Sequence, residues 1–155
     1  MRMLLAFLAC AMLAGCNAPK DRLATFDPAE YEPYAKSGSG VLAGQAFVRT
    51  RGGDVKYGAG REIVLNPVTN YSSEWYERGV KNYETLKDAD PACPKGRTTI
   101  ADAEGRFRFD GLPAGEYYVA CWIFWDMNQY SQTGGVAHAK VKVQSGQTTN
   151  VIVTR

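Results

Sequence analysis

From residue 41 onward, apolar and polar positions alternate along the chain, and this pattern predicts a β-rich domain. The alternation is strict at residues 106–109, where both phenylalanines point to one face. Seven segments have strand character: 41–50, 62–68, 97–101, 106–109, 116–125, 136–144 and 149–154. Seven strands separated by glycine- and proline-containing turns are typical of an all-β, seven-stranded sandwich with Greek-key connections.

One segment, residues 72–87, has helical rather than strand spacing. Its aromatic and aliphatic residues recur every three or four positions, and Ser72 or Ser73 could cap its first turn. Glu77 and Lys81 form a favourable pair one turn apart. We therefore expect one short amphipathic helix inserted between the strands.

The predicted strand at 116–125 is apolar on both faces, whereas a sandwich strand normally has one polar face. Its second face carries Trp122 and Phe124. The inserted helix could cover this face with Trp75, Val80 and Tyr83. Alternatively, the aromatic patch could be open for a ligand, and the sequence leaves both interpretations standing.

The first residues predict export. Arg2 precedes an uncharged stretch, residues 3–14, that is too short to span a bilayer but fits the apolar core of a signal peptide. The stretch ends in Leu13-Ala14-Gly15-Cys16, which resembles the lipobox of bacterial lipoproteins. This resemblance implies that residues 1–15 are removed as a signal peptide and that Cys16 carries the lipid, including a palmitate-type acyl chain. The alternative is an ordinary signal peptide with a chance cysteine.

Asn17 follows the cysteine, where an aspartate favours retention in the inner membrane of enteric bacteria. The resemblance therefore implies a lipoprotein of the cell envelope, anchored in the outer membrane and facing the periplasm. Three acyl chains would hold the chain firmly. Residues 16–40 contain three prolines and end in alternating serine and glycine, so we expect a flexible, partly extended tether before the domain at 41–155. Phe26, Tyr31 and Tyr34 could dock on that domain.

A motif in the middle of the domain resembles the carboxypeptidase regulatory-like domains, which are transthyretin-like (prealbumin-like) β-sandwiches. It consists of Thr99, Asp102, Gly105, Phe107 and Phe109, followed by Gly111-Leu112-Pro113-Ala114-Gly115-Glu116-Tyr117 and Val119. The resemblance covers residues 40–155. It implies a binding module, spacer or folding aid without catalysis, and a sandwich similar to that of carbohydrate-binding domains.

Four residues of this motif have structural roles on physical grounds. Gly105 permits a tight turn, and Pro113 and Gly115 form the turn that begins the next strand. Tyr117 occupies the position of a tyrosine corner, with its ring in the core and its hydroxyl bonded to backbone.

Composition and charge narrow the function classes. The chain has 155 residues, of which 45% are hydrophobic, and 18 basic and 16 acidic residues give a net charge of +2. That size fits one globular domain, and the balanced charge argues against a nucleic-acid partner. The sequence indicates the membrane as one partner, reached through the N-terminal lipid, and an envelope protein or a glycan as the other.

Catalytic and metal-binding patterns are weak. His138, the single histidine, alternates with Lys140 and Lys142 and is therefore expected on the solvent side of its strand. One histidine does not fit the transthyretin-like purine-pathway hydrolases or the iron site of intradiol dioxygenases. Zinc-ligand and calcium-loop spacings are missing from the sequence. We expect no enzymatic activity, no metal and no cofactor.

Two loops are candidate ligand sites, although ordinary solvated loops have similar compositions. The first carries a cluster of cations that suits anionic envelope polymers such as lipopolysaccharide phosphates: Arg49, Arg51, Lys56 and Arg61. The second combines amides with aromatic rings, a combination that suits sugars: Trp125, Asn128, Gln129 and Tyr130. The sequence thus predicts a non-enzymatic binding or scaffolding lipoprotein, or alternatively a carbohydrate-binding module for peptidoglycan or other glycans.

The remaining cysteines predict a disulfide. After removal of the signal peptide and lipidation of Cys16, Cys93 and Cys121 are the two free thiols, and the cell envelope is oxidising. A Cys93–Cys121 bond would pin the inserted segment to the longest strand. The alternative is two separate buried thiols.

Overall fold

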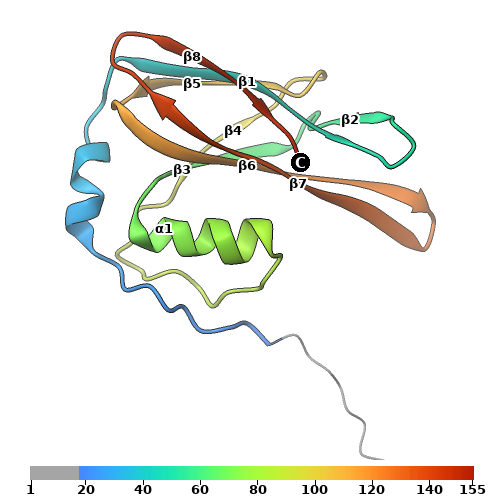
Figure 1. The fold of residues 1–155 in the computed structure, drawn as a ribbon, viewed down its shortest axis with the longest axis horizontal. Coiled ribbons are helices and arrows are strands. Elements are labelled where there is room, and N and C mark those ends of the chain that lie inside the picture. The colour runs from blue at the N-terminus through green and yellow to red at the C-terminus, as the bar shows by residue number, and fades with distance from the viewer. Residues whose placement is uncertain (1–17) are drawn as a thin grey trace, which may run out of the picture.

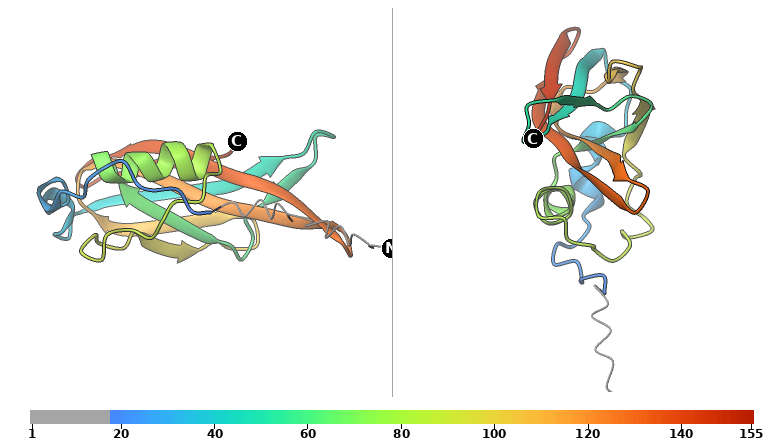
Figure 2. Two further views of the ribbon diagram at one scale, coloured as in Figure 1. Left: turned by 90° about the horizontal axis from the view of Figure 1, so that it is seen from below. Right: turned by 90° about the vertical axis from the view of Figure 1, so that its right-hand side faces the viewer.

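The computed structural model describes residues 18–155, so the predicted signal peptide and Cys16 lie outside the described residues. Within that range the chain forms a β-sandwich of two four-stranded sheets. A helix packs on the outer face of one sheet, and an N-terminal segment runs along that helix before entering the first strand (Figures 1 and 2). Among these residues, no helix is long and apolar enough to cross a membrane.

The two sheets are built around β1 and β6. In the first sheet, β1 pairs antiparallel with β2 and β5 and parallel with β8: Gly40–Arg49, Val55–Tyr57, Arg106–Leu112 and Thr148–Val153, respectively. The second sheet is antiparallel in the order β4-β3-β6-β7: Arg97–Ile100, Glu62–Pro67, Gly115–Asn128 and Ser131–Val143. A mostly β chain with two packed sheets agrees with the predicted sandwich.

The strand count differs from the expectation of seven. Each predicted strand is present, and β2 is an eighth, formed because the residues after the glycine-rich turn fold back on the end of β1. The loop expected around Asn128, Gln129 and Tyr130 is also largely replaced by β-structure. There β6 and β7 continue as a long hairpin, with Phe124 opposite Gly134 and Trp125 opposite Thr133.

The core lies between the sheets and follows the alternation of the sequence. Phe107 and Phe109 are buried, while their neighbours Arg106 and Arg108 are exposed. The largest fully buried side chains come from both sheets, with Leu42 and Leu112 in one and Ile63, Leu65 and Val119 in the other. Burial of each such side chain contributes about 2 kcal/mol to the free energy of folding, and these contributions are the main source of stability.

The inserted helix begins and ends differently from the prediction. It consists of α1 (Asn70–Glu74) followed by a π-helical stretch, η3 (Trp75–Lys81). The cap is Thr69, not Ser72 or Ser73: the Thr69 hydroxyl accepts a hydrogen bond from the Ser72 N–H, and the Ser72 hydroxyl accepts one from the Thr69 N–H. This reciprocal capping box fixes the first turn immediately after β3.

The helix covers the outer face of β6, so the aromatic patch predicted there is not an open ligand surface. Tyr76 stacks on Tyr118 with ring centroids 4.0 Å apart, and the Trp75 and Trp122 rings lie 6.3 Å apart. Val80 is fully buried. Tyr83, expected in the same contact, lies beyond the helix and is about half exposed.

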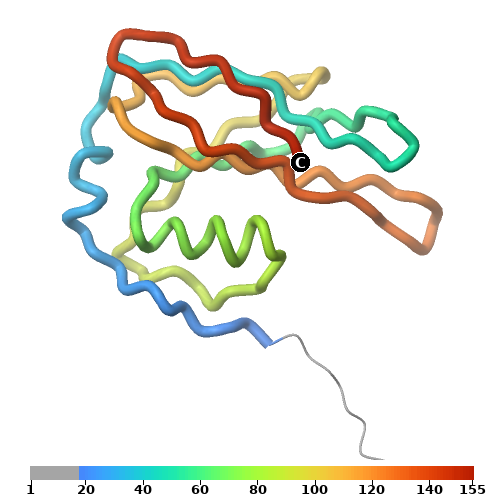
Figure 3. The backbone as a smooth tube through the Cα atoms, in the orientation of Figure 1, coloured from blue at the N-terminus to red at the C-terminus, as the bar shows by residue number. Residues whose placement is uncertain are grey.

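The N-terminal segment is docked rather than free. Residues 20–37, here called the strap, run beside the helix and then contain two single-turn 3₁₀ helices, η1 (Pro28–Glu30) and η2 (Glu32–Tyr34). The tube in Figure 3 shows the strap passing from the helix to the start of β1. The expected flexible tether is therefore an integral part of the fold over residues 20–37.

Candidate functional site

The strap forms one side of an open cavity of about 580 Å³ at one end of the sandwich. This region is called the strap end. Its walls come from the second half of the strap, the loop before β4, and the turn between β5 and β6. The volume falls in the range of pockets that hold small organic ligands.

Three aromatic rings of the strap form one wall: Phe26, Tyr31 and Tyr34. Asp27 positions them because its side chain accepts the Ala29 N–H at 2.9 Å and starts η1. Tyr31 is 7% exposed, and its hydroxyl accepts a hydrogen bond from Thr69 at 3.0 Å. The strap wall is therefore hydrogen-bonded to Thr69, the N-cap residue of α1.

Tyr117 packs against the Tyr34 ring of this wall and contributes to the lining of the same cavity. Its ring is 3% exposed and lies edge-on to Tyr34, with centroids 5.3 Å apart. Its hydroxyl donates to the Pro113 carbonyl at 2.8 Å, which is the arrangement of a tyrosine corner. Burial raises the pKa of Tyr117 to about 12, and burial likewise raises the pKa of Tyr31 to about 12. Both phenols are thus neutral lining groups at ordinary pH.

Two glycines of the central motif have identifiable roles. A Cβ at Gly115 would stand 2.6 Å from the Tyr34 ring, so the glycine admits the strap wall as well as serving the turn. Gly105 has φ +74 and lies against the Ala46 carbonyl, where a Cβ would stand at 2.5 Å. The tight turn expected at Gly105 therefore depends on the absence of a side chain.

Polar side chains line the same cavity. They are Glu32, Lys36, Lys95 and Arg97. Arg97 is held in place because its guanidinium donates to the Asp110 carbonyl at 2.8 Å. An aromatic wall with a few polar groups suits a ring-shaped polar ligand, whose apolar face packs on the rings while its hydroxyls bond to the polar groups.

The two loops singled out by the sequence lie at the other end. The β1–β2 and β6–β7 hairpins project side by side there (Figure 1), and residues 49–61 and 124–133 are here called the hairpin end. The Lys56 ammonium lies 6.0 Å from the centroid of the Trp125 ring. The Arg61 guanidinium donates to the Phe124 carbonyl at 2.8 Å. The structure thus brings Lys56, Arg61 and Trp125 together.

The other candidates at the hairpin end are exposed on the hairpins themselves. Arg49 and Arg51 lie on the β1–β2 hairpin, and Gln129 lies at the tip of the other. Asn128 uses its side-chain oxygen to accept the Tyr130 N–H at 2.9 Å, and the Tyr130 side chain is 89% exposed. The Asn128 side chain therefore shapes the tip.

His138 is not on the solvent side, because the helix covers its face of β7. It is half-buried, and its Nδ1 lies 2.9 Å from the Tyr76 hydroxyl. Burial lowers the pKa of His138, and the nearby Lys81 lowers it further. The side chain links sheet and helix.

The predicted disulfide is wrong: Cys93 and Cys121 are both free. Cys121 is buried between the sheets, opposite Ile63 in the register, and burial raises the pKa of its thiol to about 11. Cys93 lies 3.7 Å from the Tyr31 hydroxyl, beyond the far end of β3. Four residues of strand, about 13 Å, separate Ile63 from that end, whereas bridged cysteines need Cα atoms within about 7 Å.

Sequence reasoning missed the strap as a wall of the site. The available signal was three aromatic residues in an otherwise polar, proline-containing segment. Within residues 18–155, no group of three or more histidine, cysteine, aspartate or glutamate side chains is arranged to hold a metal ion.

One comparison with a known structure supports the sandwich. A crystal structure of a proposed carbohydrate-binding protein from Pseudomonas aeruginosa has a TM-score of 0.71 and 26% sequence identity, over 86% of this chain and 100% of that one. The major pilin subunit of Bacillus cereus gives a TM-score of 0.44 and 14% identity, over 76% of this chain and 30% of that one. No protein-family model and no curated protein matches the chain. The chain is therefore similar in fold to the Pseudomonas aeruginosa protein.

Proposed function

We propose that this protein is a non-enzymatic, membrane-anchored binding module of the bacterial envelope, whose ligand is a carbohydrate held in the strap-end cavity. The observation that carries this proposal is the cavity itself. Its volume of about 580 Å³ is sufficient for one or two sugar rings, and its lining includes the rings of Tyr31, Tyr34 and Tyr117.

The polar groups of the cavity extend this argument. Lys36, Lys95 and Arg97 supply cationic donors, and Glu32 supplies an acceptor. Such a set suits a glycan that carries carboxylate or acetamido groups, as peptidoglycan does. The similar Pseudomonas aeruginosa protein, described as a proposed carbohydrate-binding protein, supports the same ligand class.

The anchor and the finer fold are part of this proposal. The lipobox-like sequence at 13–16 supports lipidation of Cys16, and Asn17 supports an outer-membrane location facing the periplasm. The motif around Gly105 and Tyr117 supports a transthyretin-like Greek-key sandwich of the carboxypeptidase regulatory-like type. In this proposal the domain binds or scaffolds and catalyses nothing.

Binding of a peptidoglycan disaccharide, N-acetylglucosaminyl-N-acetylmuramate, to the detergent-purified protein tests the ligand class. Calorimetric titration should give a Kd that Tyr34→Ala raises about three- to tenfold, the range expected for one aromatic contact. Arg97→Ala provides a second cavity variant outside the strap. Tyr130→Ala, at the hairpin end, should leave the Kd unchanged. A disaccharide whose binding depends on Tyr130 and not on Tyr34 or Arg97 would place the site at the hairpin end.

The anchor has its own test. Cells grown with a fatty-acid analogue should incorporate it into the wild-type protein and not into Cys16→Ser. The membrane fraction should retain the first and lose the second. Equal labelling of both proteins would show that the lipid is not on Cys16.

A further inference from the structure

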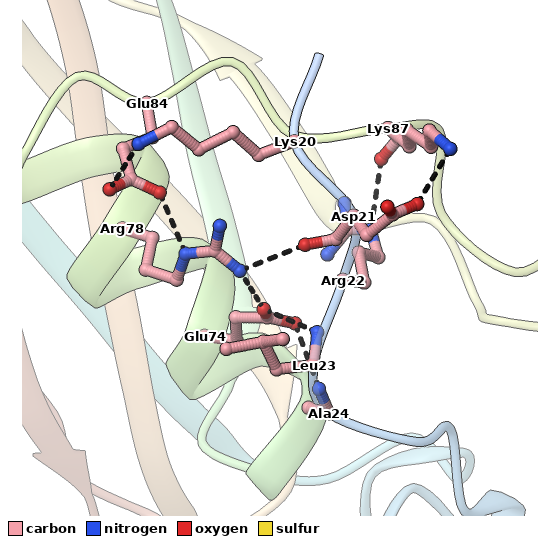
Figure 4. A network of polar contacts seen from close by, with 9 residues as sticks. All are labelled: Lys20, Asp21, Arg22, Leu23, Ala24, Glu74, Arg78, Glu84 and Lys87. Carbon is pink, nitrogen blue, oxygen red and sulfur yellow. Dashed lines mark hydrogen bonds and ion pairs between the residues drawn. The ribbon is translucent and has the colours of Figure 1, made fainter.

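The start of the strap is latched to the helix and to the loop that follows it (Figure 4). The Lys20 N–H donates to the Thr85 carbonyl at 2.8 Å, and the Lys87 N–H donates to the Lys20 carbonyl at 2.9 Å. The Arg22 guanidinium adds a hydrogen bond to the Lys87 carbonyl at 3.0 Å. Backbone pairing therefore begins at Lys20.

The contacts of residues 20–24 with Glu74, Arg78 and residues 84–87 are here called the latch. Glu74 lies at its centre. Its carboxylate accepts the Leu23 N–H at 2.7 Å and the Ala24 N–H at 3.1 Å, and it forms an ion pair with Arg78. The Glu74 side chain is 7% exposed. Arg78 in turn donates to the Asp21 carbonyl at 3.0 Å and pairs with Glu84 at 2.7 Å. One buried carboxylate thus ties the helix to two successive backbone amides of the strap.

Further ion pairs surround the latch at the surface. Lys20 pairs with Glu84 at 3.0 Å, and Lys87 pairs with Asp21 at 2.6 Å. The nine residues drawn in Figure 4 include four basic and three acidic side chains, so their charges nearly cancel. Leu23 is 81% exposed beside them. Residues 20–23 and 84–87 are here called the anchor face.

The length of chain between this face and the lipid is short. Three residues, 17–19, separate Cys16 from Lys20. Four residue steps span at most about 14 Å even when fully extended. A free spacer over residues 16–40 would have an r.m.s. reach of roughly 25–30 Å. The contacts that begin at Lys20 therefore remove most of the reach that a free spacer of that length would have.

We propose that the anchor face lies against the surface of the membrane that holds Cys16, so that the sandwich has a fixed orientation on the bilayer. This inference rests on the lipid anchor of the proposed function. A basic residue near an anionic surface contributes about 1 kcal/mol, but the acidic partners offset that attraction here. The lipid and the latch, rather than net charge, hold this face on the bilayer.

Energy transfer from two label positions on the lipidated full chain tests this orientation. In a Cys93→Ser background, Asp88→Cys places a donor dye next to the anchor face. Ala103→Cys places it on the β4–β5 turn, on the side of the sandwich away from the start of the strap (Figure 1). Cys121 is buried with a raised pKa and stays unlabelled. Acceptor headgroups are carried by vesicles of phosphatidylethanolamine and phosphatidylglycerol.

Transfer from position 88 should exceed transfer from position 103 by at least about twofold, because sheet layers about 10 Å apart separate the two positions. The difference should persist in high salt. Glu74→Ala should reduce it, while Glu77→Ala, which lies on the same helix and breaks only the exposed pair with Lys81, should leave it intact. Equal transfer from both positions in the wild type would overturn the proposal.

Failure of the anchor itself is distinguishable from failure of the orientation. An unlipidated chain incorporates no fatty-acid analogue, and both positions then give no transfer to vesicles. A lipidated chain with equal transfer from positions 88 and 103 keeps the anchor and refutes the orientation.

Discussion

The strap end and the hairpin end carry similar kinds of residue but present them differently. Each combines tyrosines with lysines and arginines. At the strap end, Tyr31 and Tyr117 are 7% and 3% exposed, and they contribute to the lining of a cavity. At the hairpin end, Tyr57 and Tyr130 are 46% and 89% exposed. Residue type alone therefore does not identify the site, because a second segment of chain must cover the rings.

The difference follows from what lies over each end. The strap supplies a third layer at one end, attached through Glu74 and through the Thr69–Tyr31 hydrogen bond. At the other end, β6 and β7 pair only with each other from Phe124 to Asn128. A two-stranded ribbon buries little surface on its own. Mutations at the two ends should thus differ in their cost.

The largest effect is expected at Tyr117. Tyr117→Ala removes a buried ring and its hydrogen bond to Pro113, and truncating a buried aromatic residue typically costs about 3–5 kcal/mol. The free energy of unfolding, measured by urea denaturation, should fall by that amount. Loss of the ring also removes part of the lining of the cavity and the packing partner of Tyr34.

Tyr130→Ala is the matched control at the hairpin end. Its exposed ring should change the free energy of unfolding by less than about 0.5 kcal/mol. If Tyr117→Ala and Tyr130→Ala lowered the free energy of unfolding equally, the hairpin tip would be packed as tightly as the strap end. That result would contradict the difference between the two ends.

Glu74→Ala should have the next largest effect. The variant leaves two strap amides and Arg78 without their carboxylate, and hydrogen bonds to a charged group are worth about 1.5–3 kcal/mol each at most. We expect trypsin to cleave more rapidly after Lys20 and Arg22, and the global stability to fall by about 1–2 kcal/mol. Glu77→Ala should leave the cleavage rate unchanged because its pair with Lys81 is exposed.

Acid should open the same latch. Burial alone would raise the pKa of Glu74, but the Leu23 and Ala24 amides and Arg78 together lower it below its ordinary value of 4.5. A carboxylate with a lowered pKa stabilises the fold above pH 4.5, and that contribution is lost as the pH falls through the lowered value. Cleavage after Arg22 by an acid-active protease should rise in this range for the wild type and less for Glu74→Ala. A flat profile in the wild type would contradict the role of Glu74.

Removing the contact between His138 and the helix should lower the free energy of unfolding by a smaller amount. Tyr76→Phe keeps the stacked ring but removes the hydrogen bond to His138, at a cost of about 1 kcal/mol. Burial and Lys81 lower the pKa of His138, so the unfolded chain binds the proton more readily. Wild-type stability should therefore be complete above pH 6.5 and decrease below it. His138→Gln should weaken this dependence, and an unchanged dependence would assign it to another group.

Much of the fold could be predicted because it depends on local alternation. All seven expected strands are present, and Tyr117 occupies the core position that its motif indicates. The helix also forms, but its cap lies at Thr69 because the capping box starts directly after β3. A sequence pattern does not show which of several nearby hydroxyls accepts hydrogen bonds from the unpaired N–H groups of the first helical turn.

Contacts between distant segments could not be predicted in the same way. The strap wall depends on Tyr34 packing against a glycine about eighty residues away, and the latch depends on Glu74 reaching Leu23. The disulfide was predicted from compartment chemistry without the strand register that separates the two thiols. The alternation predicts the strand face that carries His138 but not that the helix covers this face.

Among the variants that remove a side-chain contact, the smallest effect is expected for Lys56→Ala. The Lys56 ammonium lies 6.0 Å from the Trp125 ring centroid, and an exposed cation–π contact contributes about 0.5–1 kcal/mol. Lys56→Ala should therefore lower the free energy of unfolding by no more than about 1 kcal/mol. It should leave the Kd for the peptidoglycan disaccharide unchanged, since the cavity lies at the other end. A loss of disaccharide affinity in Lys56→Ala, with stability preserved, would transfer the binding role to the hairpin end, where the predicted cations and Trp125 meet.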